Sequence, residues 1–169
     1  MTKFKLVASR EDIAEVARLA CEIWPEHYVP IIGQAQVDYM LEKFQSARAI
    51  ADQLARQYEY YLVLDGGQSA GYVAIVPSAG ESTLLLSKMY IRKELRGQGM
   101  GKETLGFVEG LCRQRGIKTI WLTVNKNNAR SLAWYKQMGF DTVRPAVQDI
   151  GGGFVMDDFV MEKQIETFQ

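Results

Sequence analysis

The sequence predicts a single domain of mixed α/β type. The 169 residues fit one hydrophobic core, and the shares of hydrophobic (47%) and charged (24%) residues are close to those of average globular domains. Apolar residues recur with a period of two in some segments and of three to four in others, so both strands and helices are expected. The sequence contains no internal repeat, low-complexity tract or linker, and residues 1–169 are therefore expected to form one domain.

A strand and a helix are expected at the start of the chain. Residues 3–8 alternate apolar and polar side chains, which is typical of a strand. Ser9, followed by Asp12 three residues later, is a helix-start signature. The apolar residues of this helix recur at helical spacing: Ile13, Val16, Leu19, Ala20 and Ile23.

Two prolines are expected to end this first helix. Pro25 and Pro30 would bracket a loop, because proline lacks an amide hydrogen and clashes with the preceding helical turn. The aromatic residues of the expected loop are Trp24, His27 and Tyr28. A second helix is expected over 34–44, followed by a third turn or helix that ends near residue 56.

Three antiparallel strands are expected in the middle of the chain. Residues 60–64 and 71–76 are rich in aromatic and β-branched side chains, and Asp65-Gly66-Gly67 between them is a hairpin turn. Residues 83–91 form a longer apolar run without a break, which indicates the third strand of the set.

Helices and strands alternate in the last part of the chain. The segment RKELRGQGMG leads into a helix that Gly116 is expected to close with a left-handed cap. A compact strand follows at 119–124, and Asn127 or Asn128 can cap the next helix, which Gly139 closes. The final two strands, joined by three glycines, are expected at 140–147 and 154–162.

Charge and cysteine usage restrict the classes of partner. Lys+Arg and Asp+Glu both number 20, so the chain lacks the basic surplus that nucleic-acid binding requires. Two cysteines, Cys21 and Cys112, cannot build a disulfide framework, which favours a reducing compartment. The N-terminus lacks the apolar core of a signal peptide, and no apolar run is long enough to span a bilayer. We therefore expect a cytoplasmic protein without nucleic-acid or membrane partners.

A glycine-rich turn, Arg96-Gly97-Gln98-Gly99-Met100-Gly101, lies between the strand at 83–91 and the next helix. Its glycines permit positive φ angles and the close approach of a ligand. The helix start offers unpaired amides and a partial positive charge, which together suit a pyrophosphate. Lys93, Arg96 and Lys102 flank the turn and would add to the attraction.

Three phosphate-binding motifs can be compared with this turn. A P-loop is excluded because Glu103 follows Lys102 where Ser or Thr is required, and a kinase is disfavoured with it. The dinucleotide fingerprint fails because Lys102 occupies the position of the third glycine. The pattern that fits is R-x-x-G-x-G, through Arg96, Gly99 and Gly101. On these residues alone, a tight turn without a ligand stays open as the alternative.

The order of long strand, R-x-x-G-x-G and helix resembles the coenzyme A site of the GCN5-related N-acetyltransferases (GNAT family). The segment N-x-x-S-L-A-W-Y-x-x-x-G-F, from Asn128 to Phe140, is similar to the second signature of that family. The resemblance implies a mostly antiparallel, twisted sheet of about seven strands, flanked by four or five helices. It also implies that the strands at 83–91 and 119–124 splay apart to admit coenzyme A.

The resemblance further implies acetyl-CoA as cosubstrate and a set of residues that bind it. Main-chain groups of Met89 and Ile91 would bond to the pantetheine arm, since an exposed strand edge suits an amide chain. The amides from Gly97 to Lys102 would hold the pyrophosphate. The full set of expected cofactor-binding residues is Met89, Ile91, Arg96, Gly97, Gln98, Gly99, Met100, Gly101, Lys102, Asn128 and Ser131. No metal is expected.

Tyr135 matches the proton donor of the family. The thiolate that leaves when an amine attacks the thioester needs a proton, and a nearby phenol can supply it. The competing interpretation is an aromatic residue on a buried helix face. The base that takes the proton of the amine is not determined, because the strand segment Leu84-Leu85-Leu86-Ser87 lacks a carboxylate. The candidates are a water chain or one of four side chains: Glu26, Asp157, Asp158 and His27.

The acceptor is expected to be a primary amine of a small molecule, with a polyamine-like compound slightly favoured. Trp24, His27 and Tyr28 would line one side of the substrate groove, and Asp149 and Asp157, with Asp158, the other. Two alternatives are a protein lysine or N-terminal acetyltransferase and a non-catalytic coenzyme A sensor. The alternating C-terminal strand also leaves a homodimer open.

Overall fold

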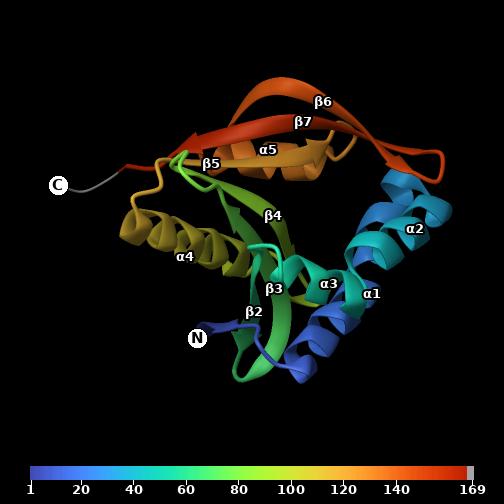
Figure 1. The fold of residues 1–169 in the computed structure, drawn as a ribbon, viewed down its shortest axis with the longest axis horizontal. Coiled ribbons are helices and arrows are strands. Elements are labelled where there is room, and N and C mark those ends of the chain that lie inside the picture. Colours follow the sequence, from blue (N-terminus) through green and yellow to red (C-terminus); the bar gives the residue numbers. More distant parts are fainter. Residues whose placement is uncertain (167–169) are drawn as a thin grey trace. The chain divides into compact units, whose positions relative to one another are not determined.

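The structure is a computed structural model of the chain, and it describes residues 1–166. Its elements in chain order are β1 (Thr2–Leu6), α1 (Arg10–Ile32), α2 (Gln34–Phe44), α3 (Ala47–Leu54), β2 (Glu59–Asp65), β3 (Gln68–Pro77), β4 (Thr83–Ile91), η1 (Lys93–Leu95), α4 (Met100–Arg115), β5 (Thr119–Asn125), α5 (Ala129–Gln137), β6 (Asp141–Gly151) and β7 (Phe154–Gln164). The strands follow the order β1-β2-β3-β4-β5-β7-β6 in one sheet (Figure 1). The predicted α/β class is confirmed, and the described residues form seven strands and five helices where about seven strands and four or five helices were predicted.

The chain divides into two compact units, residues 1–76 with 88–105, and residues 77–87 with the rest of the chain from 106. The first unit therefore contains β1 to β3, α1 to α3, the second half of β4 and the start of α4. The second unit contains the first half of β4, most of α4, and β5 to β7 with α5.

Antiparallel strands β1, β2 and β3 form the sheet of the first unit. Lys3 pairs with Leu64, and Leu62 pairs with Tyr72. The turn between β2 and β3 is the predicted one, and Gly66 and Gly67 have φ angles of 57° and 84°, which glycine adopts without steric cost. Strand β3 is longer than predicted, because Gln68 and Ser69 continue the pairing with β2 up to the turn, after a shift of register at Ala70.

Helix α1 starts where the sequence predicts. The Ser9 side chain accepts a hydrogen bond from the Asp12 amide, and Asp12 in turn accepts one from the Ser9 amide, which completes a capping box. The Asp12 carboxylate also accepts from Lys5 Nζ at 2.8 Å, and this bond, with the capping bonds, lowers the pKa of Asp12 to about 2.

The predicted end of this helix is wrong. Pro25 and Pro30 both lie inside α1, which continues to Ile32, so the aromatic residues around them lie on a helix and not in a loop. Each proline removes one helical hydrogen bond. The buried face of the helix compensates, because most helical stability in proteins comes from tertiary packing. That buried apolar face is Val16, Leu19, Ala20, Ile23 and Trp24.

In the second unit, strands β5, β6 and β7 are antiparallel to their neighbours, whereas β4 and β5 are parallel. The parallel pairing covers three residue pairs, from Thr83↔Thr119 to Leu85↔Trp121. Among the described residues, the pairing does not extend to Leu86 and Ser87, which follow in the same unit. The hydrogen-bonded pairing of β5 with β4 therefore ends at Trp121, whereas β5 itself continues to Asn125.

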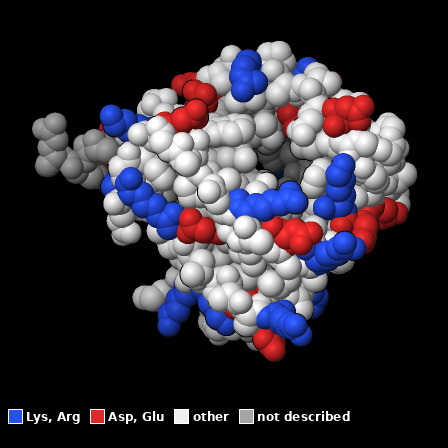
Figure 2. Space-filling model, viewed as in Figure 1, with Lys and Arg blue, Asp and Glu red and all other residues white. Residues whose placement is uncertain are grey.

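Charged side chains of both signs are interspersed on the face shown in Figure 2. This agrees with the equal numbers of basic and acidic residues in the sequence. Attraction to a polyanion such as nucleic acid requires a concentration of basic residues, so overall charge offers no argument for it.

Gly71 provides a test of the packing between β3 and β4. A Cβ atom added there would lie 2.1 Å from the main-chain oxygen of Tyr90 and 3.0 Å from Ile91 Cα, so backbone would have to move. We expect Gly71→Ala to lower the free energy of unfolding by about 1–3 kcal/mol, measured by urea denaturation.

Gly106→Ala in α4 is the control. It meets nothing within 4 Å and should stabilise the protein by about 0.5–1 kcal/mol. Equal stability of the Gly71 variant and the native protein would contradict the close approach of the two strands.

Candidate active site

The glycine-rich turn has the backbone geometry that an anion site requires. Gly97 and Gly99 have φ angles of 78° and 86°, a region in which other residues are strained. Helix α4 begins at Met100, and the Glu103 amide donates to the Gly99 carbonyl at 3.0 Å. The amides of Met100 to Lys102 therefore have no acceptor within the helix, because the first helical acceptor, the Gly99 carbonyl, is bonded to the Glu103 amide. Amides at the positive end of a helix dipole suit an anion such as a pyrophosphate.

The start of α4 is fixed by packing. The Met100 side chain is 5% exposed and lies in a core cluster with Val63, Ala70 and Ile91. The buried Thr104 hydroxyl donates to the Met100 carbonyl at 2.8 Å. Gly99, Gly101 and Lys102 thus lie at a helix start whose position is determined by the core of the first unit.

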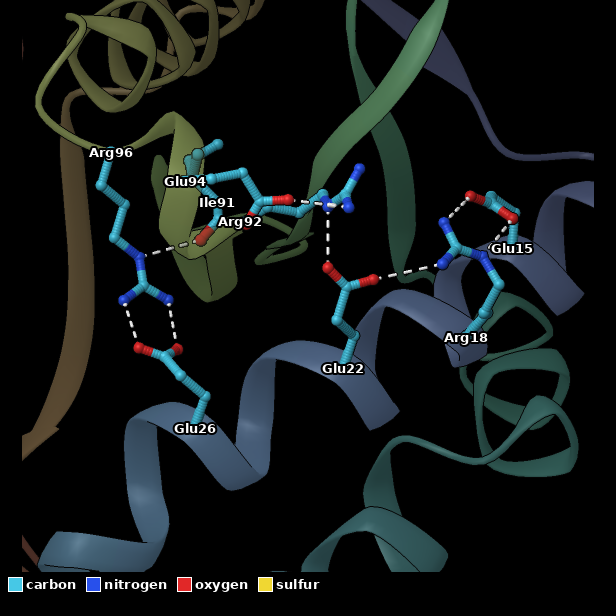
Figure 3. Close-up of polar contacts among 8 residues, drawn as sticks. All are labelled: Glu15, Arg18, Glu22, Glu26, Ile91, Arg92, Glu94 and Arg96. Carbon is cyan, nitrogen blue, oxygen red and sulfur yellow. Dashed lines mark hydrogen bonds and ion pairs between the residues drawn. The ribbon is translucent and has the colours of Figure 1, made fainter.

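Arg96 is engaged by a carboxylate from helix α1. Its two terminal nitrogens donate to the two oxygens of Glu26 at 3.0 and 2.9 Å, and its Nε donates to the Ile91 carbonyl at 3.0 Å (Figure 3). Burial opposes the ionisation of Glu26, but the hydrogen bonds and charge of Arg96 outweigh it and lower the pKa of this carboxyl group. Both oxygens are occupied, so Glu26 is poorly suited to accept a proton from a substrate.

The other expected cofactor-binding residues of the first unit lie along β4 and the turn. Met89 is half-buried on β4, and Ile91 is 9% exposed. The Ile91 carbonyl already accepts from Arg96. Gln98 is exposed, and its side-chain nitrogen donates to the Glu94 carbonyl at 3.2 Å. A further ligand at Ile91 would therefore meet an occupied carbonyl.

In the second unit, Asn128 caps helix α5. Its side-chain oxygen accepts from the Ser131 amide at 3.3 Å, and the residue is 4% exposed. This confirms one of the two predicted caps. Gly139 has a φ angle of 98° after the helix, as its expected closing role requires. Ser131 is half-buried on the first turn of the helix.

Tyr135 lies on a helix without a buried face. Every residue of α5 is half-buried or exposed, and Tyr135 is half-buried. Its ring packs edge-on against Phe140 at 5.3 Å and against Trp134 at 5.1 Å. Phe140 is 1% exposed and its amide donates to the Tyr135 carbonyl. Tyr135 is thus held in place by a core residue without being a core residue itself.

The three aromatic residues expected to contact the acceptor have different environments on α1. Trp24 is 4% exposed, and its Nε1 donates to the hydroxyl of Tyr72 at 3.2 Å, so it is a core residue. His27 and Tyr28 are half-buried and pack edge-to-face at 4.6 Å. The Tyr28 hydroxyl is hydrogen-bonded to that of Tyr90 at 3.1 Å. Of the three, only His27 and Tyr28 are exposed enough to meet a substrate.

The acidic residues expected in the groove also differ from one another. Asp149 accepts from the Gly151 amide at 2.8 Å and thereby caps its own turn. Asp157 forms an ion pair with Lys126 at 2.7 Å. Asp158 is 6% exposed, and its burial raises its pKa to about 6, an effect that Asp157 reinforces. A hydrogen bond from Thr123 and the charge of Lys126 oppose this shift without cancelling it.

Sequence reasoning missed a buried lysine. Lys88 is 6% exposed on β4, and its Nζ donates to the Phe44 carbonyl at 2.7 Å, to Gln53 Oε1 at 2.9 Å and to the Tyr60 hydroxyl. Burial lowers the pKa of Lys88 to about 7. The available signal was strand alternation, because Lys88 shares a face of β4 with the buried Leu84 and Leu86. The network ties β4 to the end of α2 and to α3.

Comparison with known proteins assigns the chain to a family. The sequence matches the Acetyltransferase (GNAT) family over residues 15–140. The chain belongs to the GNAT family of acetyltransferases. It is therefore an N-acetyltransferase of the GNAT type, and the resemblance seen in the two sequence motifs is confirmed.

Individual relatives act on different acceptors. The GNAT protein is 24% identical to spermidine N(1)-acetyltransferase of Thermoplasma acidophilum over 94% of its own length and 95% of the relative. It is 25% identical to the ribosomal protein bS18 alanine N-acetyltransferase of Escherichia coli over 57% of its length and 64% of the relative. The PaiA N-acetyltransferase of T. acidophilum, solved in complex with coenzyme A, has the same fold, with a TM-score of 0.78 at 21% identity over 96% and 99% of the two chains.

Two further properties concern the described residues. Within residues 1–166, no group of three or more His, Cys, Asp or Glu side chains is arranged to hold a metal ion. In the same range, the helices are all too short or too polar to cross a membrane.

Asp158 makes a testable contribution to stability. Its pKa is about 6 in the folded protein and 3.8 in an ordinary environment, so the folded state binds more protons between these values. The free energy of unfolding should therefore fall as pH rises from about 4 to about 6. Asparagine carries no charge at either pH, so Asp158→Asn removes this pH-dependent decrease in the free energy of unfolding. We expect the variant to be more stable than the native protein by up to about 3 kcal/mol at pH 8 but by little at pH 4. Urea denaturation at both pH values measures the difference.

The neighbouring residue provides the control for this measurement. Asp157→Asn breaks an exposed ion pair with Lys126 but also relieves its repulsion of Asp158, so it should change the free energy of unfolding by at most about 1 kcal/mol. If Asp158→Asn destabilises the protein equally at pH 4 and pH 8, the carboxylate is not held in an unfavourable environment.

Proposed function

We propose that this GNAT protein transfers the acetyl group of acetyl-CoA to a primary amine of a small molecule, with a polyamine-like acceptor favoured. The observation that carries the proposal is the glycine-rich turn, with positive φ at Gly97 and Gly99, which leads into a helix start that the core holds in place. In an N-acetyltransferase family, an anion site of this kind suits the pyrophosphate of coenzyme A.

Several groups of the chain would bind the cosubstrate. The amides from Gly97 to Lys102 would bind its pyrophosphate, and the exposed Lys93 and Lys102 would add positive charge. Main-chain groups of Met89 and the Ile91 amide would bond to the pantetheine arm, as the family resemblance implies. Asn128 and Ser131 would position the arm near the thioester.

The thioester of acetyl-CoA supplies the acetyl group. The nitrogen of the neutral amine attacks the thioester carbonyl, a C–N bond forms, the C–S bond breaks, and the nitrogen releases one proton to solvent as it becomes the amide. The departing thiolate takes a proton from the Tyr135 hydroxyl, which acts as general acid. Solvent then returns a proton to the phenolate. Tyr135 suits this role because it is half-buried and its ring is fixed by the buried Phe140.

We further propose Asp158 as the base that accepts the proton of the attacking ammonium group. It lies in the same unit as Tyr135 and pairs in register with Asn125, at the end of β5 that leads to α5. Its raised pKa of about 6 is close to the range in which a general base works best at neutral pH. The oxygens of Glu26 are occupied by Arg96, and Asp157 is paired with Lys126. His27 is the competing candidate.

Two features support a cationic small-molecule acceptor. A relative of nearly equal length is a spermidine N(1)-acetyltransferase. In the second unit Asp149 offers negative charge, and Asp157 offers it in part because Lys126 pairs with it. In the first unit His27 and Tyr28 offer aromatic surface, and both kinds of group attract an ammonium group. Trp24 would act from behind Tyr28, whose ring centroid lies 4.5 Å from its own.

A second acceptor class, a protein lysine or N-terminal amine, is supported by the similarity to the bS18 alanine N-acetyltransferase. A homodimer is supported by two exposed valines on the edge strand β6, Val143 and Val147, since large apolar side chains on a sheet edge favour association. Val155 on the neighbouring strand β7 is also exposed.

The release of free thiol from acetyl-CoA tests the proposal. Purified protein is incubated with polyamines, aminoglycosides, amino acids and short peptides, and turnover with polyamines should exceed that with the other classes. Tyr135→Phe should lower kcat by about 10²–10⁴-fold while the Kd for coenzyme A stays unchanged. Tyr39→Phe, a half-buried tyrosine on α2, is the control and should retain full turnover. Tight coenzyme A binding without turnover on any amine would favour a sensor.

The dependence of the rate on pH tests the base. With Asp158 as base, kcat should rise through about pH 6 and level off, because only the carboxylate accepts a proton. Asp158→Asn should lower kcat by about 10²–10⁴-fold and remove this limb of the profile. His27→Gln should leave the limb in place. The assignment is overturned if the limb persists in Asp158→Asn and disappears in His27→Gln.

A further inference from the structure

Helix α1 contacts the glycine-rich turn through a bidentate ion pair. The Glu26 carboxylate accepts from both terminal nitrogens of Arg96, at 3.0 and 2.9 Å, and Arg96 Nε donates to the Ile91 carbonyl at 3.0 Å. Figure 3 shows the two groups facing each other, with Glu26 on the helix and Arg96 at the end of the segment after β4. The Arg96 and Glu26 side chains are 25% and 30% exposed, so solvent screens this pair less than it screens most surface pairs.

The geometry of the pair is specific to its two residues. A planar guanidinium and a carboxylate form two parallel hydrogen bonds, which fixes orientation as well as distance. Lysine has a single charged nitrogen and cannot reproduce this arrangement. A glutamine at position 26 would present one amide group to the guanidinium, so one of the two hydrogen bonds would be lost.

Arg96 stands directly before the two glycines with positive φ. Glycine has more conformational freedom than any other residue, so Gly97 and Gly99 would not hold their amides in one direction without external anchors. The exit of the turn is anchored by the buried Met100. Its entrance is anchored by Arg96, whose amide also donates to the Lys93 carbonyl. Leu95, directly before Arg96, also packs against the core cluster, and Glu26 adds the side-chain contact that holds the Arg96 guanidinium.

The charge of Arg96 is balanced by Glu26. A guanidinium whose two terminal nitrogens are bound to a carboxylate attracts a phosphate less than a free one does. The observed contacts therefore favour an indirect role for Arg96 over direct contact with the pyrophosphate. The amides of the turn and the exposed Lys93 and Lys102 are left to carry the attraction.

A second contact between the same two segments serves as an internal comparison. Glu22 lies one helical turn before Glu26 and accepts from Arg92 Nε at 2.8 Å. Arg92 also pairs with Glu94 at 2.7 Å, and Glu22 with Arg18 at 3.2 Å. This neighbouring ion-pair network joins α1 to the same segment but ends before the glycines.

We propose that Glu26 is a positioning residue for the coenzyme A site: through Arg96 it orients the amides of Gly97 to Lys102. This inference rests on the proposed binding of coenzyme A at the turn. Helix α1 also presents His27 and Tyr28, so the element proposed to meet the acceptor is the one that orients the cofactor turn. The affinity for coenzyme A then depends on Glu26, which lies 70 positions away from Arg96 in the sequence.

Calorimetric binding of coenzyme A and steady-state kinetics test the inference. Glu26→Gln and Arg96→Lys should each raise the Kd for coenzyme A and the KM for acetyl-CoA by about tenfold, with kcat and the KM for the amine changed less than about threefold. Glu22→Gln, in the neighbouring network, is the matched control and should change neither constant more than about twofold. A merely structural role would instead lower kcat and the melting temperature together. If Arg96 contacted the pyrophosphate directly, Arg96→Lys would bind nearly normally and Glu26→Gln would bind more tightly.

Hydrogen exchange without any cofactor separates this inference from the proposed function. Amides 97–103 should exchange faster in Glu26→Gln than in the native protein, and at the native rate in Glu22→Gln. Unchanged exchange and an unchanged Kd in Glu26→Gln would overturn the inference while the native protein still binds coenzyme A. If the native protein does not bind coenzyme A, the proposed function fails and the role assigned to Glu26 in cofactor binding fails with it, whatever the exchange rates.

Discussion

The proposed cofactor site depends on holding the main-chain amides of a helix start in one orientation. The first amides of any helix lack a partner within the helix, and a glycine-rich turn before them adds freedom where order is needed. In this protein the exit of the turn is held by the burial of Met100 and the entrance by the ion pair of Arg96 with Glu26. The glycines can therefore adopt positive φ angles while the two anchors limit the conformational freedom of the turn.

Two of the carboxylates considered as bases are compensated by a neighbouring cation. Glu26 is bound by Arg96, and Asp157 is bound by Lys126. Asp158 is the contrasting case, since burial raises its pKa and no full counter-charge offsets that burial. Lys88 is also buried, but three oxygen acceptors surround its nitrogen, so its role is to join β4 to helices α2 and α3. A carboxylate kept at a cost to stability is a candidate for chemistry, whereas a fully bonded lysine is a candidate for structure.

Much of the fold was predictable because local rules decided it. Ser9 and Asp12 form a capping box, Asn128 caps α5, and the Gly66-Gly67 turn joins β2 to β3, all within a few residues of sequence. Long-range contacts overruled the local rule at Pro25 and Pro30, where the sequence indicated a loop and the buried face of α1 keeps the helix intact. Trp24 was expected to contact the acceptor, but it is a buried residue whose Nε1 donates to the Tyr72 hydroxyl.

The sequence by itself determined the α/β class, the family and the position of the glycine-rich turn, because motif spacing and periodicity are properties of short segments. Only the tertiary structure decided which charged groups are paired. Glu26 and Arg96 are 70 residues apart, and Lys88 meets Phe44 and Gln53 across 44 and 35 residues. The pKa of Asp158 likewise depends on burial by residues distant in the chain. Electrostatic roles are set by distance and solvent exposure in three dimensions, and neither quantity is encoded in local spacing.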